Sequence, residues 1–113
     1  MSEHLPKICI IDALDAIETI LEFSKEIDFD TYMNDRKTRD AIYRNIEVLG
    51  ETVDRMPQYF LVNHPEIPWQ KMLSTRNAIV HGYDKINDKI VWNIITNILP
   101  DLKIKLVTLL EGL

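Results

Sequence analysis

The sequence has few of the residues that would place it in several large classes of protein. It contains one cysteine, so an internal disulfide bond is impossible and nothing favours secretion. Three glycines and five prolines in 113 residues exclude collagen-like and low-complexity chains. No apolar run approaches the ~20 residues of a membrane span, and the first residues do not form a secretion signal. We therefore expect a cytoplasmic protein with no membrane partner and one domain over residues 1–113.

An excess of positive charge is also missing. Thirteen lysines and arginines stand against 18 aspartates and glutamates, which gives a formal net charge of -5 at pH 7. Proteins that bind nucleic acid through bulk charge neutralise many phosphates with basic side chains, so this composition argues against that mode of binding. A local basic pocket is still compatible with the total.

The apolar residues that are present recur with a helical period almost throughout. This pattern predicts a first helix over residues 6–25, a long helix over 36–55, a third from about 68 to 81, and a last helix from 88 onward. Residues 28–35 form a connector with room for one short helical turn capped by an aspartate. Since no alternating strand pattern is found, the predicted fold class is all-α, a four- to five-helix up-down bundle.

Three residues interrupt these helical patterns. Pro57 is expected to end the long helix, and Pro100 to bend the last helix or to begin a second segment of it. Gly50 lies inside the long helix, where glycine costs ~1 kcal/mol relative to alanine. That cost indicates that another backbone passes close to it.

The predicted apolar stripe of the last helix consists of Val91, Ile94, Ile98, Leu102, Leu106 and Leu109.

One cationic residue interrupts the apolar face of the third predicted helix. Arg76 occupies a position where a leucine would pack. The other members of that face are apolar or aromatic: Trp69, Met72, Leu73, Ile79, Val80 and Tyr83. An unpaired guanidinium removed from water would cost several kcal/mol. Arg76 is therefore expected either to meet an acid of the long helix, such as Glu47 or Asp40, or to face a cleft that receives an anion.

His81 lies near the end of the same predicted helix. Its imidazole is suited to proton transfer, although a histidine at this place also serves as a cap or a surface residue. Five residues separate Arg76 from His81, about 140° around an ideal helix, so their side chains point in different directions. A shared site then needs either the reach of Arg76 past the helix end or two facing copies of the helix, which predicts a symmetric homodimer. The three dispersed histidines and one cysteine show no metal-ligand spacing.

Arg76, His81 and Tyr83 form an ordered motif, with four residues between the first two and one between the last two. This pattern resembles the Arg-x4-His-x-Tyr signature of the HEPN superfamily, in its HepT-like toxin branch. Other segments are similar to the long helix, the loop before the motif helix and the last helix of that family: residues 35–41, 45–51, 65–69, 91–92 and 99–102. The resemblance covers nearly the whole chain.

The resemblance implies an all-helical homodimer that cleaves RNA, not DNA, without a metal ion or another cofactor. Arg76 would bind the scissile phosphate, and His81 would act as general acid or base while a ribose 2′-hydroxyl attacks the phosphorus. The products would be a 2′,3′-cyclic phosphate and a 5′-hydroxyl. Asn77 would be a polar positioning residue. Tyr83 would accept AMP from a cognate minimal nucleotidyltransferase antitoxin, adding bulk and negative charge that repel RNA.

Four residues of the predicted long helix share one face. They are Arg36, Asp40, Tyr43 and Glu47, and further positive charge comes from Lys37, Arg39 and Arg44. In one interpretation Arg36 and its basic neighbours guide RNA while Glu47 or Asp40 orients Arg76. In the other, the face is solvated and carries ion pairs, which is common for such patterns.

Two further functions stay open at this point. One is a non-catalytic helical protein that binds nucleotide or docks a nucleotidyltransferase, and the negative net charge favours it. The other is a helical dimerisation domain with a buried Arg–Glu pair. The presence of both Arg76 and His81 favours the enzyme, because a docking surface has no need of the pair.

Overall fold

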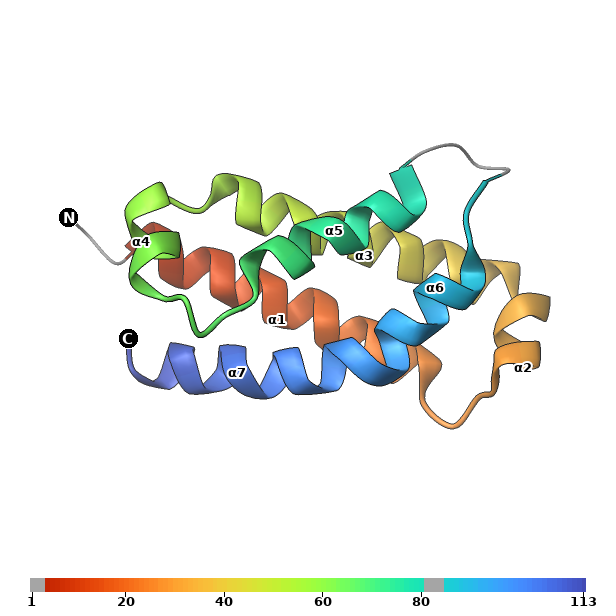
Figure 1. The fold of residues 1–113 in the computed structure, drawn as a ribbon. Coiled ribbons are helices and arrows are strands. Elements are labelled where there is room, and N and C mark those ends of the chain that lie inside the picture. Colours follow the sequence, from red (N-terminus) through yellow and green to blue (C-terminus); the bar gives the residue numbers. More distant parts are fainter. Residues whose placement is uncertain (1–3, 81–84) are drawn as a thin grey trace.

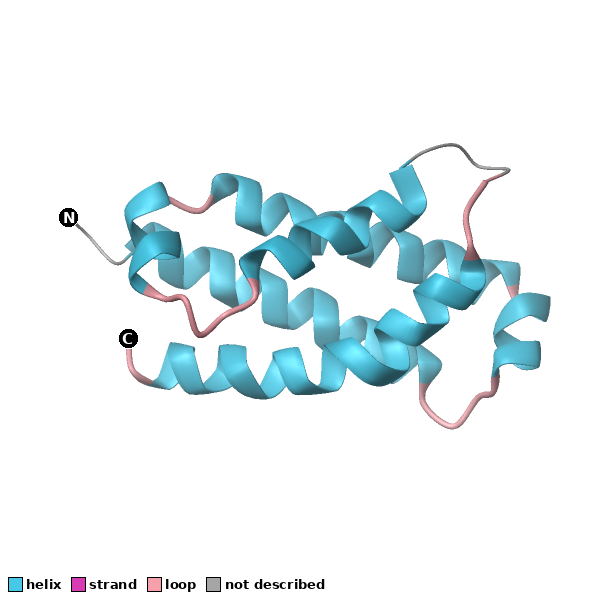
Figure 2. Cartoon of the chain, viewed as in Figure 1, coloured by secondary structure: helices cyan, strands magenta, loops and turns pink. Residues whose placement is uncertain are grey.

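The computed structural model describes residues 4–80 and 85–113, and this part of the chain is helical without strands (Figures 1 and 2). Its elements are α1 (His4–Ser24), α2 (Phe29–Asn34), α3 (Arg36–Arg55), α4 (Gln58–Asn63), α5 (Trp69–Val80), α6 (Asp88–Asn93), the π-helix η1 (Ile94–Ile98) and α7 (Leu99–Glu111). The predicted all-α fold is confirmed. The bounds of the predicted long helices agree with the structure to within two residues wherever the structure describes them.

The long helices form an up-down bundle (Figure 1). Helix α1 packs against both α3 and α7, and α5 packs on α3. The segments α6, η1 and α7 follow one another without a break and make the fourth long element. The short helices α2 and α4 lie at opposite ends of the bundle, and α1 begins near the end of α7 (Figure 1). None of the described helices has the length and apolar character required to cross a membrane.

Short polar contacts set the helix ends. Asp28 accepts a hydrogen bond from the amide of Thr31 at 2.8 Å and caps α2, as predicted for this connector. Asp35 caps α3 in the same way, accepting from the amide of Thr38 at 3.0 Å and from its hydroxyl at 2.6 Å. The side-chain and backbone hydrogen bonds from Thr38 lower the pKa of Asp35. Helix α3 ends two residues before Pro57, which confirms the predicted stop.

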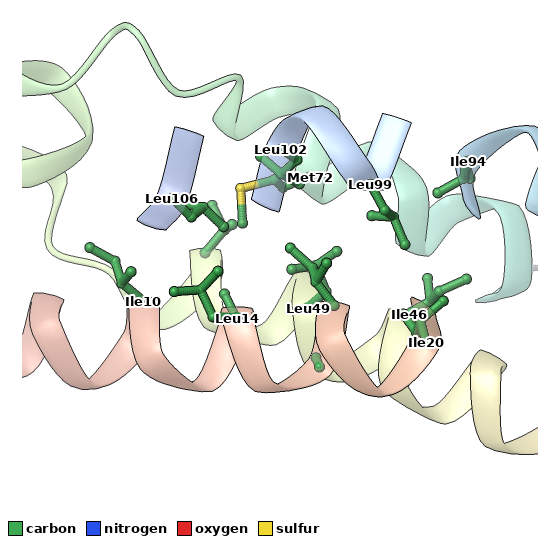
Figure 3. Close-up of a cluster of buried hydrophobic side chains, with 14 of the residues drawn as sticks. Ile10, Leu14, Ile20, Ile46, Leu49, Met72, Ile94, Leu99, Leu102 and Leu106 are labelled. Atoms are coloured by element: carbon green, nitrogen blue, oxygen red, sulfur yellow. The ribbon is translucent and has the colours of Figure 1, made fainter. Parts of the chain in front are cut away.

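The core lies between α1, α3, α5 and the last helical segment (Figure 3). The apolar stripe of α3 and its C-cap residue is buried in full: Ile42, Ile46, Leu49, Val53 and Met56. In Figure 3, Ile46 and Leu49 of α3 belong to one buried cluster with side chains of α1 and α7, among them Ile10, Leu14, Leu102 and Leu106. Cys9, which lies within an apolar run of α1, is also buried. This core fixes how α5 lies on α3, and that contact holds the candidate site.

A π-helical turn precedes Pro100 in the last helical segment. The amide of Leu99 donates to the carbonyl of Ile94, five residues earlier. A proline ring in an α-helix clashes with the carbonyl four residues before it, and a π-turn widens the helix at this point. The extra residue rotates the apolar face, so that Ile95 and Leu99 are buried while Ile98 is only partly buried. The predicted effect of Pro100 is confirmed, and Ile98 of the predicted stripe packs against the core while being only partly buried.

Candidate functional site

Arg76 lies where α5 packs against Gly50 of α3. A Cβ atom built on Gly50 would lie 2.9 Å from Cδ of Arg76 and 3.0 Å from its Cβ. Carbon atoms in van der Waals contact are about 3.5–4.0 Å apart, so a larger residue at position 50 would require Arg76 to shift. The close approach predicted at Gly50 is confirmed, but the Arg76 side chain makes it rather than a passing backbone.

The guanidinium of Arg76 forms an ion pair with Asp54, one turn beyond Gly50 on α3. Nη1 of Arg76 lies 2.5 Å from Oδ2 of Asp54, and 30% and 54% of the two side chains are exposed. The expectation that Arg76 meets an acid of the long helix is therefore confirmed, but the acid is Asp54 and not Glu47 or Asp40, which were named as examples. Asp54 follows Glu47 by seven residues and lies on the same face of the helix. Continuing the predicted face of the long helix by two turns beyond Glu47 would have identified Asp54 as a candidate partner. Because the Arg76 side chain keeps contact with solvent, an anion has access to it.

A groove of about 300 Å³ begins roughly one helical turn from Arg76, and we call it the α3–α5 groove. Its described walls are Arg36, Asp40, Tyr43, Arg44, Glu47, Ile79 and Ile86. The four residues predicted to share a face of the long helix thus come together here. Ile79 follows Arg76 by three residues on α5, and Glu47 precedes Gly50 by three residues on α3. The groove therefore lies about one turn along both helices from the contact that holds Arg76.

Two tyrosines hold one wall of the α3–α5 groove in place. The hydroxyls of Tyr32 and Tyr43 both donate to Oδ1 of Asp88, the first residue of α6, and the bond from Tyr32 is 2.7 Å long. Burial raises the pKa of each tyrosine, and the hydrogen bond to Asp88 raises it further. Tyr32 is fully buried, and its ring lies 5.1 Å from that of Trp92. These contacts join α2, α3 and α6 beside the groove, and helical spacing alone does not reveal them.

Arg36 and Arg39, two of the basic residues predicted to guide RNA, differ from each other in their surroundings. Arg39 donates to the backbone carbonyls of Tyr32 and Met33 at the end of α2, so it stabilises that helix rather than facing a ligand. Arg36 lies 3.7 Å from Asp40, and both side chains are largely exposed. This pair fits the interpretation of a solvated helix face, although both residues also line the α3–α5 groove.

The last predicted site residues are Asn77, His81 and Tyr83. Asn77 follows Arg76 on α5, but it is exposed and is not among the groove walls. His81 and Tyr83, predicted as the acid–base residue and the AMP acceptor, lie outside the described residues. Over residues 4–80 and 85–113, no three His, Cys, Asp or Glu side chains are grouped as they would be around a metal ion.

Comparisons with known proteins match nearly the whole chain. The family model described as "Ribonuclease HepT-like" matches residues 13–109. A protein of Methanocaldococcus jannaschii named "Putative RNase MJ0127" is 35% identical over 92 residues, which cover 81% of this chain and 76% of the relative. A protein of Thermococcus cleftensis named "Probable ribonuclease HepT" is 37% identical over 92 residues, covering 81% of this chain and 84% of the relative. No solved structure matches the chain.

Proposed function

The chain belongs to the ribonuclease HepT-like family, and we propose that it is a metal-independent RNA endonuclease in which Arg76 holds the scissile phosphate. The observation that carries this proposal is the setting of Arg76. Its stem lies over Gly50, its guanidinium is held by one carboxylate, and the side chain still contacts solvent. A planar guanidinium offers two parallel N–H donors to the oxygens of a phosphate, which suits it to this role.

In the proposed reaction the ribose 2′-hydroxyl attacks the adjacent phosphorus. His81 acts as general base, accepting the 2′-hydroxyl proton, or as general acid, giving a proton to the departing 5′-oxygen. A new bond joins the 2′-oxygen to phosphorus as the bond to the 5′-oxygen breaks, leaving a 2′,3′-cyclic phosphate and a 5′-hydroxyl. Arg76 stabilises the charge that develops on the phosphate, and Asn77 helps to position the RNA. General acid–base catalysis of this kind contributes about 10²–10⁴-fold to the rate.

We further propose that the working enzyme is a symmetric homodimer. Arg76 and His81 are five residues apart, about 140° around a helix, so a single helix does not direct both at one phosphate. Two facing copies supply an arginine from one protomer and a histidine from its partner.

The proposed biological role is that of a toxin in a two-gene toxin–antitoxin module. A cognate nucleotidyltransferase would transfer AMP to Tyr83, two residues after His81. The adenylate adds bulk and negative charge beside the proposed phosphate site, and both oppose the binding of RNA.

The nuclease is tested by incubating purified protein with total RNA and a chelator, followed by analysis of the fragment ends. We expect cyclic phosphate ends from the wild type and a loss of about 10²-fold or more in Arg76→Ala and His81→Ala. Arg55→Ala is the matched control, because Arg55 is a partly exposed arginine of α3 that pairs with Asp12. Cleavage by Arg76→Ala at the wild-type rate would exclude the proposed role of this residue.

The modification is tested by intact mass after incubation with ATP and the partner enzyme. We expect added AMP units on the wild type and none on Tyr83→Phe. Unchanged labelling of that variant would place the acceptor on another residue.

One observation favours a second candidate, a non-catalytic partner that binds nucleotide or docks a nucleotidyltransferase. The net charge is -5, and Arg76 already has a carboxylate partner in Asp54. This candidate predicts tight binding of the nucleotidyltransferase without any cleavage of RNA, so the first assay separates the two.

A further inference from the structure

We propose that the α3–α5 groove binds one unstacked RNA base, that guanine is its preferred occupant, and that Glu47 selects it. This inference rests on the proposed ribonuclease function, because the groove begins about one helical turn from Arg76. It adds to that function the identity of the base recognised beside the cut.

The size and lining of the groove suit a single base. Its volume of about 300 Å³ is at the lower end of the range for small-molecule sites, about 300–1,000 Å³. The described walls combine one aromatic ring and two isoleucines with four charged side chains. Proteins read single-stranded RNA by stacking unpaired bases on aromatic rings and by hydrogen bonding to the base edges. The groove offers both kinds of contact.

Tyr43 supplies a rigid aromatic wall. Its hydroxyl donates to Asp88, and Tyr32 donates to the same carboxylate oxygen, so the polar end of Tyr43 is already bound. The ring is therefore held in place before any ligand arrives, which reduces the entropy lost on binding. Ile79 and Ile86 give the groove further apolar surface. A flat base is the part of RNA that fits against such walls.

Glu47 is an acid of this groove that has no partner among residues 4–80 and 85–113. Its side chain is half-buried, lines the groove, and forms no hydrogen bond or ion pair with any described residue. Asp54, rather than Glu47, binds Arg76. A carboxylate accepts hydrogen bonds through two adjacent oxygens, and guanine presents two adjacent donors, N1–H and the 2-amino group. Adenine and cytosine place an acceptor nitrogen beside their amino group, which would oppose the second oxygen.

The other charged residues of the groove suit the rest of a nucleotide. Arg36, Arg44 and Asp40 are all exposed. Arg36 lies 3.7 Å from Asp40, so its positive charge offsets the negative charge of that carboxylate. Exposed guanidinium groups bind backbone phosphates, which position the RNA, while contacts to base edges specify it. With Glu47 more deeply placed than these arginines, the groove is arranged for a base and its flanking phosphates rather than for a simple anion.

Binding of mononucleotides to the full-length protein tests this assignment without any need for cleavage. Calorimetric titration compares guanosine, inosine and adenosine 3′-monophosphates. We expect guanosine 3′-monophosphate to bind about tenfold or more tightly than the adenosine compound, with inosine in between because it lacks the 2-amino group. Glu47→Gln should remove this discrimination. Glu51→Gln, an equal change at an exposed acid of α3 outside the described groove walls, should preserve it.

Equal binding of the guanosine and adenosine compounds by the wild type would overturn the assignment, as would absence of binding or a guanine preference that survives Glu47→Gln. Mapping of cleavage sites on RNA of random sequence separates this inference from the proposed function. Cleavage without a guanine preference beside the cut would overturn the base site and leave the nuclease standing. Absence of cleavage would refute the nuclease, and nucleotide binding would still decide whether the groove selects guanine.

Discussion

Replacing Gly50 with alanine tests how tightly Arg76 packs on α3. In an isolated helix this change stabilises by about 1 kcal/mol, because alanine is the better helix former. In the folded protein the new methyl carbon would lie 2.9 Å from Cδ, 3.0 Å from Cβ and 3.4 Å from Cγ of Arg76. Cδ can rotate away, but Cβ is bonded to the backbone of α5. The helix α5 must therefore move to admit the methyl group.

Two opposing contributions set the expected change in the free energy of unfolding of Gly50→Ala: the gain in helix propensity and the cost of crowding Arg76. Forcing a methyl group into a packed contact costs about 1–3 kcal/mol. After subtracting the gain in helix propensity of about 1 kcal/mol, we expect Gly50→Ala to lower the free energy of unfolding by up to about 2 kcal/mol. For a domain of this size each kcal/mol corresponds to about 4 °C in the melting temperature.

A double-mutant cycle with Arg76→Ala isolates the contact. Truncating Arg76 removes Cγ and Cδ and leaves only the Cβ contact at 3.0 Å, so Gly50→Ala should cost about 1 kcal/mol less in that background. Urea denaturation of the wild type, both single variants and the double variant measures this coupling energy. If Gly50→Ala stabilises the wild type by the full helix-propensity amount, or if the coupling energy is zero, Arg76 does not pack tightly on Gly50.

Three further predictions follow from contacts of the described residues. Asp54→Asn should change the free energy of unfolding by less than about 1 kcal/mol in urea denaturation, because both members of the ion pair are partly exposed; a loss of several kcal/mol would contradict this. Burial raises the pKa of Tyr32, so the folded protein keeps a proton that the unfolded chain loses above about pH 10. Stability should fall as the pH rises past that value, and melts at alkaline pH should show a smaller fall in Tyr32→Phe. Asp35→Ala should lower the melting temperature at neutral pH because it removes the cap of α3, whereas Asp35→Asn keeps a side-chain acceptor. Because hydrogen bonds from Thr38 lower the pKa of Asp35, the advantage of wild type over Asp35→Asn should be present above about pH 4 and lost as the pH falls further.

The sequence by itself determined the features that depend on neighbours along the chain. Apolar residues repeated every three or four positions specify a helix and the face that it buries, so the all-α class and the buried stripe of α3 were predictable. Caps and stops are equally local, which is why an aspartate cap for the short helical turn and the stop at Pro57 were predicted correctly. Arg76 was identified as a candidate site residue because a cation interrupts an apolar face, and this too is local information.

Only the tertiary structure decided which residue of one helix meets which residue of another. The pairing of Arg76 with Asp54 and of Tyr32 and Tyr43 with Asp88 joins residues 22 to 56 positions apart. Helical period defines a face but not the offset of one helix along another, and each residue of offset moves a contact by about 1.5 Å and 100°. The core side chains of α1, α3, α5 and α7 set that offset together, so Asp54 rather than Glu47 meets the guanidinium.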